Sequence, residues 1–233
     1  LWRIVNTANA RTMYLELSGA NARVVGTDGG PLAEPYGVET LVVPVGQRYD
    51  LEVRYEQPGP VVLDTLLPKR VGDALVWEPK PVFAVDVAET GDAVRELPYL
   101  PGAAIPLRIP DRAETLVFDA VNGAQGVEWR INGRSHHDEP LFTFTEGQTA
   151  RLRLVNRLGP EHPFHLHGQF FTIVPDGRLE TEQPGLKDTV LVPGMSTVEI
   201  TAYLDNPGRW MAHCHILEHA ALGMMAEFVV EPL

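Results

Sequence analysis

Six of the eight histidines and the only cysteine of this 233-residue chain lie in two short stretches. The first stretch reads HPFHLH (162–167), and the second reads HCHILEH (213–219) and is followed by Met224. Imidazole, thiolate and thioether groups are ligands that copper and zinc bind well. The concentration of these groups at one end of the chain therefore predicts metal chemistry there.

Strand geometry divides these ligands into two sets. Successive side chains of an extended strand point to opposite faces, so the two histidines of HCH share one face and the cysteine takes the other. Three ligands placed in this way need two metal centres. The same alternation separates the first histidine of HPFHLH from the other two. The predicted sets are His165, His167, His213 and His215 on one side, and His162 and Cys214 on the other.

The set that contains the cysteine continues along the chain, where His219 follows Cys214 by five residues and Met224 follows by five more. With His162, these groups are typical of a blue copper site that has a weak axial methionine. Zinc also binds cysteine and histidine, but a structural zinc site does not need an all-imidazole group behind the cysteine. Two HxH pairs beside Cys-x4-His-x4-Met also argue against ordinary core or surface histidines. The four other imidazoles suit one metal or part of a cluster, and strand parity leaves both open.

The sequence around these ligands repeats once along the chain. RIVN at 3–6 recurs as RLVN at 153–156, an offset of 150, and segment 43–63 matches segment 192–212 with an offset of 149. The repeat predicts two copies of one β unit. Shifted back by the offset, the ligand positions meet no histidine or cysteine in the first copy. They fall on Thr12, Leu15, Leu17, Asp64, Thr65 and Leu66.

Short alternating runs separated by Gly and Pro predict antiparallel sandwiches or barrels. The best helical candidate is 216–224, which Gly223 would end, and the Pro-rich segment 88–111 is predicted to be a linker. The predicted strands include 48–55, 81–88, 149–156 and 197–204.

Composition excludes several classes of function. The formal net charge of −12 is unfavourable for binding nucleic acid, which requires clustered Lys and Arg. No run of 18 apolar residues is present to span a membrane, and one cysteine cannot form an internal disulfide. The chain begins in the middle of a strand-like pattern, so we expect it to be part of a longer protein.

HPFHLHG (162–168) and HCHILEHAALGMM (213–225) resemble the two C-terminal copper motifs of the multicopper oxidases, the laccase-like enzymes. TDGGPLAEP (27–35) and VPVGQRYDLEV (43–53) resemble the copper-free middle domain of that family. The resemblance extends over almost the whole chain, and the C-terminal motifs are very specific.

The resemblance implies an all-β fold with two cupredoxin-like Greek-key β-sandwich or barrel domains in tandem. Residues 1–100 would form a copper-free domain that is incomplete at its N-terminus, and residues 101–233 would form the copper-binding domain. The implied ligands are His162, Cys214, His219 and axial Met224 for the type 1 copper, His165 for the type 2 copper, and His167, His213 and His215 for the type 3 pair.

The family chemistry is one-electron oxidation of phenols or aromatic amines at the type 1 copper, with reduction of dioxygen to water at a trinuclear copper cluster. Cys214 and its neighbours His213 and His215 would form the catalytic electron path between the two centres. The resemblance also implies a periplasmic or extracellular location.

The sequence departs from the family pattern at several positions. The cluster of the family takes eight histidines, and this chain has four of them, so a missing N-terminal domain or another chain would supply the rest. His136 and His137 are adjacent, which is the wrong parity, and we expect them in a loop near the pocket mouth. Ala220 stands where many bacterial relatives carry an acidic residue that delivers protons. No Met-rich insert typical of cuprous oxidases is present, which favours phenols or aromatic amines as substrates.

Two further residues near the motifs have structural alternatives. Asp188, in LKDTV, is predicted either to orient a ligand imidazole from behind or to be a plain turn residue. Met225 is predicted to be a core residue, because the spacing of five selects Met224 as the ligand.

Other functions remain open at this point. An electron-transfer module would need the type 1 site alone, and it would have no use for the four paired histidines. A copper nitrite reductase also has a histidine beside the type 1 cysteine, but its mononuclear site does not need imidazoles on both sides. A copper-free interaction protein would have no reason to keep the complete ligand set.

Overall fold

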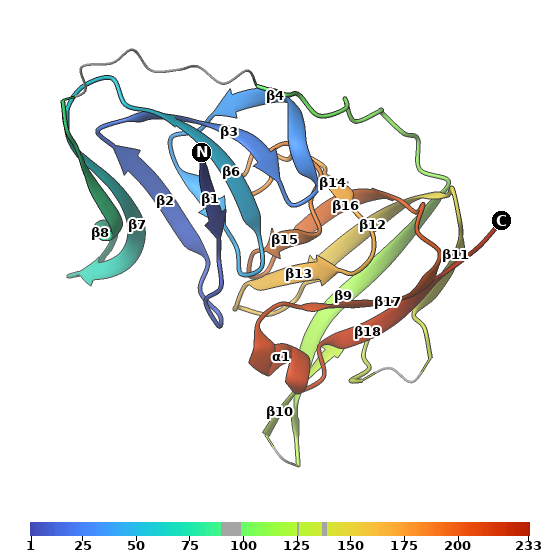
Figure 1. Cartoon of the computed structure of the whole chain (residues 1–233). Coiled ribbons are helices and arrows are strands. Elements are labelled where there is room, and N and C mark those ends of the chain that lie inside the picture. The colour runs from blue at the N-terminus through green and yellow to red at the C-terminus, as the bar shows by residue number, and fades with distance from the viewer. Residues whose placement is uncertain (90–98, 125, 137–138) are drawn as a thin grey trace.

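The computed structural model describes residues 1–89, 99–124, 126–136 and 139–233. Within these residues the chain forms four β-sheets and one short helix, arranged as two β units side by side (Figure 1). Each unit has its own cluster of buried apolar side chains. The predicted all-β architecture is therefore confirmed, and no described helix is long and apolar enough to cross a membrane.

The first unit consists of two four-stranded sheets, with the orders β1-β6-β3-β4 and β5-β2-β7-β8. Inward-pointing residues of both sheets, such as Leu15, Tyr49 and Leu51, form its core. The strands are β1 (Trp2–Val5), β2 (Met13–Ser18), β3 (Asn21–Thr27), β4 (Gly30–Gly37), β5 (Leu41–Val43), β6 (Arg48–Arg54), β7 (Gly59–Val71) and β8 (Ala74–Val87).

The second unit consists of two five-stranded sheets, with the orders β10-β9-β12-β16-β14 and β11-β18-β17-β13-β15. Helix α1 (Leu217–Ala221) connects β17 to β18. The strands are β9 (Arg112–Gly123), β10 (Gly126–Ile131), β11 (Phe142–Thr145), β12 (Thr149–Asn156), β13 (His162–Leu166), β14 (Phe171–Ile173), β15 (Thr189–Val192), β16 (Thr197–Tyr203), β17 (Gly208–Cys214) and β18 (Met225–Glu231).

The four predicted strands are present as β6, the end of β8, β12 and β16. Alternation identified β6, β12 and β16 because one face of each strand packs on a core while the other is more exposed, whereas β8 has no buried residue. The predicted helix is also present as α1, which is followed by Gly223 at φ +118°.

The segment predicted to be a linker joins β8 to β9. Its described residues, 88–89 and 99–111, contain no helix or strand, and 90–98 lie outside the described residues. The Tyr99 hydroxyl donates to the carbonyl oxygen of Leu32, and Gly102 N–H donates to the same oxygen at 2.8 Å. The chain near residue 100 thus lies against the first unit, and the domain boundary at 100 stays a prediction.

The strand order repeats between the units. The sheet β5-β2-β7-β8 corresponds to β15-β13-β17-β18, and β1-β6-β3 corresponds to β12-β16-β14. Leu15 lies opposite Thr65 in the first unit, as Phe164 lies opposite Cys214 in the second. Both members of these pairs are related by an offset of 149, so Thr65 occupies the position of the cysteine.

This register corrects the sequence comparison on β2, where the offset is 149 and not 150. It makes Met13, Glu16 and Ser18 the counterparts of His162, His165 and His167, in place of Thr12, Leu15 and Leu17. The sequence match could not locate this change, because the offset shifts by one residue in the loop that precedes the strand. The first copy still carries none of the histidines.

Asn6 and Asn156 show that the repeat is structural. Both side chains are buried. Asn6 Nδ2 donates to Val43 O at 2.7 Å, and Asn156 Nδ2 donates to Val192 O at 3.2 Å. Each Oδ1 accepts the backbone N–H two residues further on, at 3.0 and 2.9 Å. Each asparagine therefore ties the end of a strand in one sheet to an edge strand, β5 or β15, of the other sheet in its own unit.

Candidate metal centres

Two adjacent strands of the second unit, β13 and β17, position most of the candidate ligands. Phe164 lies opposite Cys214, and His165 lies opposite His213. Residues directly opposite one another share a face of the sheet. Cys214 belongs to the core cluster of the unit, whereas His165 and His213 point the other way, toward the first unit. The side chains are thus sorted as strand alternation predicts.

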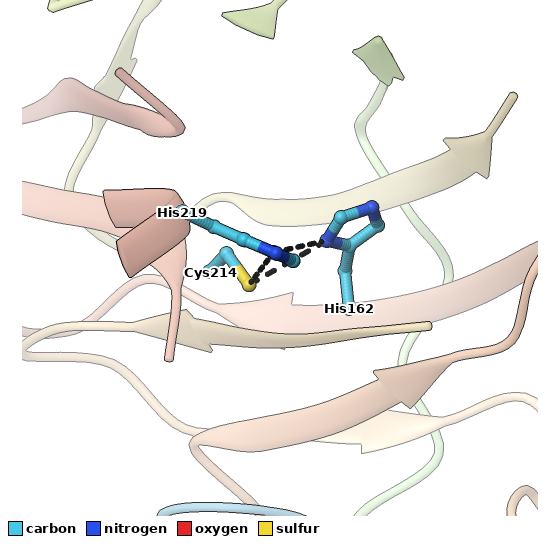
Figure 2. A group of neighbouring side chains, drawn as sticks. All are labelled: His162, Cys214 and His219. Atoms are coloured by element: carbon cyan, nitrogen blue, oxygen red, sulfur yellow. Dashed lines mark hydrogen bonds between the residues drawn. The ribbon is translucent and has the colours of Figure 1, made fainter. Parts of the chain in front are cut away.

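Cys214, His162 and His219 converge on one point (Figure 2). The Nδ1 atoms of the two histidines are 3.1 Å apart, and each lies 3.6 Å from Cys214 Sγ. A triangle with these sides has a circumradius of about 2.0 Å, so one point lies at that distance from all three atoms. Zinc bonds to imidazole are about 2.0–2.1 Å and to thiolate about 2.3 Å. The three atoms therefore have the spacing of ligands around one transition-metal ion.

Burial keeps the imidazoles of this group neutral. Desolvation, helped by the neighbouring His219, lowers the pKa of His162 to about 3, and desolvation also lowers the pKa of His219. Burial raises the pKa of the Cys214 thiol to about 12. A bound cation would displace the thiol proton, because a coordinating thiol is deprotonated. Neutral imidazoles and a buried thiol are a donor set that fits copper.

Helix α1 and the turn after it position His219 and Met224, the last two predicted ligands of the group that contains Cys214. His219 lies in the helix, and Gly223 follows it at φ +118°, where a Cβ would meet the backbone of β10 at 2.4 Å. Met224 is fully buried in the same core cluster as Cys214. Cys214 N–H donates to Met224 O at 3.1 Å, and Met224 N–H donates to His219 O at 2.9 Å. The backbone of Met224 is therefore tied to both of the other residues.

Trp129, on β10, covers the ring of His219 and was not singled out from the sequence. The indole and imidazole centroids are 3.8 Å apart with planes inclined by 27°, and the edge of His162 meets the same indole at 5.5 Å. The backbone N–H of Trp129 donates to Leu222 O at 3.0 Å, and this bond fastens β10 to the end of α1. A lone tryptophan in an alternating strand carries no ligand signal, so only the fold reveals this contact.

The four other histidines gather on the opposite face of β17. The centroid of the His165 ring lies 4.6 Å from His167, 5.4 Å from His213 and 5.6 Å from His215. His167 Nε2 and His213 Nε2 are 3.0 Å apart. With His165, these two residues form a second group among the described residues that could hold a metal ion.

Hydrogen bonds set the tautomers of two of these rings. His165 Nδ1 donates to Asp188 O and His213 Nδ1 donates to Cys214 O, both at 2.8 Å, so each lone pair is at Nε2. Burial lowers the pKa of His213 to about 4 and also lowers the pKa values of His167 and His215. These three imidazoles are therefore neutral near pH 7, as metal ligands must be.

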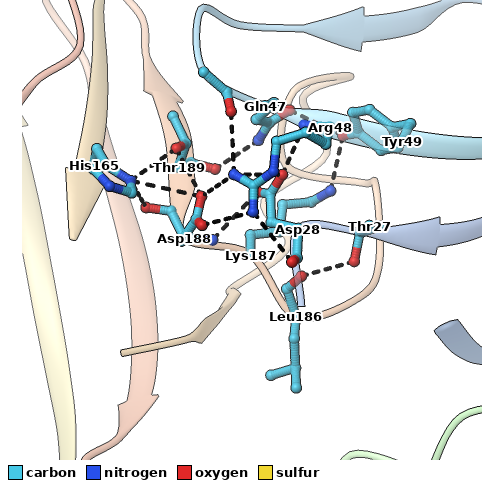
Figure 3. Close-up of polar contacts among 11 residues, drawn as sticks. Thr27, Asp28, Gln47, Arg48, Tyr49, His165, Leu186, Lys187, Asp188 and Thr189 are labelled. Carbon is cyan, nitrogen blue, oxygen red and sulfur yellow. Dashed lines mark hydrogen bonds and ion pairs between the residues drawn. The ribbon is translucent and has the colours of Figure 1, made fainter. Parts of the chain in front are cut away.

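Asp188 supports His165 and is itself held by the first unit (Figure 3). Besides its carbonyl contact, its Oδ1 lies 3.6 Å from His165 Nδ1. Arg48 Nη1 and Nη2 each donate to one carboxylate oxygen of Asp188, both at 2.8 Å. Burial alone would raise the pKa of Asp188, but hydrogen bonds from His165 and Arg48 outweigh it and hold this pKa well below its usual range. These contacts are those that the predicted orienting role requires.

The polar network continues between the two units. Lys187 is fully buried, and its Nζ donates to Tyr49 OH at 2.8 Å. Gln47 Nε2 donates to Thr189 O at 2.6 Å, and Asp28 Oδ1 accepts Arg48 N–H at 2.7 Å. Burial and the charge of Asp188 raise the pKa of Asp28, and burial lowers the pKa of Lys187 to about 8.

Sequence reasoning missed this network, because its members come from three separate segments (Figure 3). The available signal was the polar run Gln47–Arg48 beside the strand pattern of β6, and the charged pair Lys187–Asp188 before β15. Charged residues between strands usually lie in solvent, and only the approach of the two units brings these residues together.

Met225 does not lie in the core, contrary to the prediction. It is half-buried and lies opposite His213 in the pairing of β17 with β18. Because Ala226, Phe228 and Val230 point inward from β18, strand alternation sends Met225 to the imidazole face.

The remaining predicted residues lie around α1. His136 is exposed, and its backbone N–H donates to Gly223 O at 3.3 Å. It therefore lies in a loop next to the end of α1, the helix that carries His219. His137 lies outside the described residues. Ala220 is buried, whereas Glu218 is exposed and its charge acts on His219. Ala220 therefore offers no acidic group at the position after the histidine.

Comparison with known proteins gives consistent matches over both units. The sequence pattern of a family described as "Multicopper oxidase" matches residues 109–233, and a second pattern with the same description matches residues 1–61. The chain is 27% identical to Multicopper oxidase MmcO of Mycobacterium tuberculosis, over 95% of this chain and 44% of the relative. It is 29% identical to a laccase of Haloferax volcanii, over 99% of this chain and 44% of the relative.

Solved structures share the same architecture. McoA multicopper oxidase from Aquifex aeolicus matches with a TM-score of 0.83 and 26% identity, over 98% of this chain and 54% of that chain. The laccase-like multi-copper oxidase CueO from Ochrobactrum sp. matches with a TM-score of 0.80 and 30% identity, over 98% and 55%. The two units therefore have the cupredoxin-like fold, and the chain spans about half the length of the relatives it matches.

Proposed function

Because this chain belongs to the multicopper oxidase family, we propose that it carries the type 1 copper site and half of the oxygen-reducing cluster of a laccase-like oxidase. Bound copper would take single electrons from a phenolic or aromatic amine reductant and reduce dioxygen to water. The proposed ligands are His162, Cys214, His219 and axial Met224 for type 1, His165 for type 2, and His167, His213 and His215 for type 3.

The observation that carries this proposal is the position of Cys214 between two ligand sets. Its thiol meets two imidazole nitrogens at 3.6 Å on one face of β17. Its own carbonyl accepts the Nδ1–H of His213 at 2.8 Å, and that ring belongs to the other face. One peptide bond and one hydrogen bond thus join the two centres. An electron carrier with a type 1 site alone would leave the four grouped imidazoles without a use.

The other half of the cluster is proposed to come from a further segment. The chain spans about half the length of its relatives, and the described residues hold four grouped imidazoles on the face toward the first unit. A preceding cupredoxin domain or another chain would supply four more histidines. A periplasmic or extracellular location stays a prediction from the family resemblance.

Copper titration of the metal-free chain tests the type 1 assignment. We expect one equivalent of copper(II) to produce the intense blue absorption of a copper–thiolate bond. Cys214→Ser should remove the colour, Met224→Leu should shift the band and the potential, and Met225→Leu should leave both unchanged. A copper-loaded protein without colour, or a blue Cys214→Ser variant, would contradict the ligand assignment.

Oxygen consumption with a phenolic reductant tests the cluster separately. The chain alone should become reduced once and then stop, because it holds half of the required imidazoles. Adding the segment that carries the other four histidines should restore continuous turnover. Turnover by the chain alone, shown to be homogeneous by mass spectrometry, would overturn the half-cluster assignment.

A further inference from the structure

Three consecutive residues of the first unit reach the imidazole face of the second. Gly46 lies against the ring of His215. Gln47 Nε2 donates to Thr189 O at 2.6 Å, and the Arg48 guanidinium binds the carboxylate of Asp188. The copper-free unit thus touches the candidate cluster through the turn that precedes β6.

Arg48 is held in one orientation. Besides its two bonds to Asp188, its Nη1 donates to Gly46 O and its Nη2 donates to Asp28 O, both at 3.2 Å. Its backbone N–H donates to Asp28 Oδ1 at 2.7 Å. The planar guanidinium presents its donors in a fixed fork that matches a carboxylate, and a lysine ammonium cannot reproduce this geometry. The Arg48 contact therefore fixes the plane of the Asp188 carboxylate.

The fixed Asp188 in turn faces His165. Its carbonyl accepts the Nδ1–H of this ring at 2.8 Å. The Thr189 hydroxyl donates to Asp188 Oδ1 at 2.9 Å and lies 3.1 Å from the same Nδ1. Within the described part of the chain, the polar contacts of this ring nitrogen thus come from Asp188 and Thr189, which Arg48 and Gln47 hold (Figure 3).

Gly46 leaves the space that the His215 ring occupies. Its φ is +90°, and a Cβ built there would lie 2.6 Å from Cδ2 and 2.7 Å from Nε2 of His215. Any side chain at residue 46 would have to displace this ring. Gly30 provides a comparison, because it has φ +109° with nothing within 4 Å of the same position.

We propose that the segment 46–48 of the copper-free unit is a positioning element for the imidazole cluster, in which Arg48 acts through Asp188 on His165 and Gly46 makes room for His215. This inference rests on the proposed function in taking His165 and His215 as metal ligands. It gives the first unit, which has none of the histidines, a direct part in forming the cluster. Groups behind a ligand imidazole set its tautomer and orientation, and their loss typically weakens metal binding about 10–100-fold.

Copper(II) titration of the full chain beyond the first, blue equivalent tests Arg48. Arg48→Met should weaken the second class of copper binding about 10–100-fold while the blue absorption stays unchanged. Arg48→Lys should not restore this copper affinity, because lysine returns the positive charge without the planar pair of N–H donors. Arg23→Met is the matched control, since Arg23 makes a 2.8 Å ion pair with Glu52 elsewhere in the same unit. Unchanged second-site affinity in Arg48→Met, or equal loss at both sites, would overturn the proposal.

Nitrogen NMR of the metal-free chain provides a test that does not depend on copper. His165 should show a single Nδ1–H tautomer, and this proton should exchange with solvent faster in Arg48→Met and at an unchanged rate in Arg23→Met. Unaltered exchange in Arg48→Met would overturn the positioning role. If the wild-type chain binds no second copper by itself, the titration is repeated with the segment that carries the other four histidines. If the first, blue equivalent does not form, the proposed function fails, and the NMR comparison still decides the inference.

Gly46→Ala and Gly30→Ala test the contact with His215. Both replacements strain a positive-φ glycine, and Gly46→Ala also has to displace the His215 ring, so it should lower the stability more than Gly30→Ala. Only Gly46→Ala should also shift the His215 ring signals and weaken the second copper site. Equal spectra and equal second-site affinity for the two variants would contradict the role of Gly46.

Discussion

The indole of Trp129 stacks on the imidazole of His219, with centroids 3.8 Å apart and planes inclined by 27°. The strand that carries Trp129 is also bonded to the end of α1 through Leu222 O. One face of a proposed type 1 ligand is thus covered by an apolar group. Because the shell around a metal site controls solvent access and hence its potential, Trp129 should tune the copper without binding it.

Replacing Trp129 by Leu should lower the reduction potential of the blue copper. Water that reaches His219 would stabilise the more highly charged cupric form. A tenfold change in the balance between the two oxidation states corresponds to about 59 mV for a one-electron couple, and we expect a shift of about this size or smaller. A redox titration followed by the blue absorption measures the shift.

Two further variants control this experiment. Trp129→Phe keeps an aromatic face and should recover most of the potential. Trp77 contacts Tyr14 in the first unit, with centroids 5.2 Å apart, so Trp77→Leu should leave the potential unchanged. An unmoved potential in Trp129→Leu, or an equal shift in Trp77→Leu, would show that the stack has no such role.

Thr65→Val should stabilise the protein. Thr65 occupies in the first unit the position that Cys214 has in the second, and its buried Oγ1 has no hydrogen-bond partner among the described residues. A buried polar group without a partner costs about 1–3 kcal/mol. Valine keeps the shape and removes the hydroxyl, so the free energy of unfolding should rise by about 1 kcal/mol, as measured by urea denaturation.

The matched control for Thr65 is Thr181. This residue is equally buried, but its Oγ1 lies 2.7 Å from Asp176 Oδ1. Thr181→Val should therefore lower the stability by about 1–3 kcal/mol. The same sign for both replacements would mean that the Thr65 hydroxyl is satisfied after all.

Lys187→Met should change the pH dependence of stability on the alkaline side. Burial lowers the pKa of Lys187 from 10.5 to about 8 in the folded protein. Between these values the unfolded chain holds the lysine proton that the folded protein has lost, so this group makes the stability rise with pH. Each pH unit is worth up to about 1.4 kcal/mol, so Lys187 should add about 1–2 kcal/mol between pH 8 and pH 9.5. Lys187→Met should lack this rise. Cys214 acts in the opposite direction, because burial raises its pKa in the folded protein to about 12, and the comparison with the variant isolates the contribution of Lys187.

The control for Lys187 is an exposed lysine. Lys80 pairs with Glu78 at the surface, and Lys80→Met should keep the alkaline rise. The measurements stay below pH 10, where tyrosines of the unfolded chain begin to ionise. An equal change in stability between pH 8 and 9.5 in the wild type and in Lys187→Met would contradict the prediction.

Alanine at Asn6 or Asn156 should destabilise its own unit. Each substitution leaves a buried backbone carbonyl and a backbone N–H without the amide that joins them. At about 1–3 kcal/mol for each unsatisfied group, we expect losses of roughly 2–6 kcal/mol in urea denaturation. Asn21 bonds Glu56 at the surface, and Asn21→Ala should change the stability by less than about 0.5 kcal/mol. A small effect at the two buried positions would show that they are not structural counterparts.

Much of the fold and of the metal groups could be predicted from local patterns. Alternation located β12 and β16, because their faces differ in burial, and the repeat indicated two similar units. The separation of Cys214 from His213 followed from parity alone, since neighbours on a strand always face opposite ways. Met225 was misassigned because ligand spacing, not the strand pattern of β18, was used to place it.

The amino-acid sequence by itself determined which side chains on β13 and β17 can share a metal ion, because the backbone geometry of a strand assigns each residue to a face. It could not determine the groups that support those ligands. Arg48 reaches Asp188 across 140 residues of chain, and Trp129 reaches His219 from a different sheet. These contacts depend on how the two units and the two sheets pack, and packing brings together segments that no local period relates.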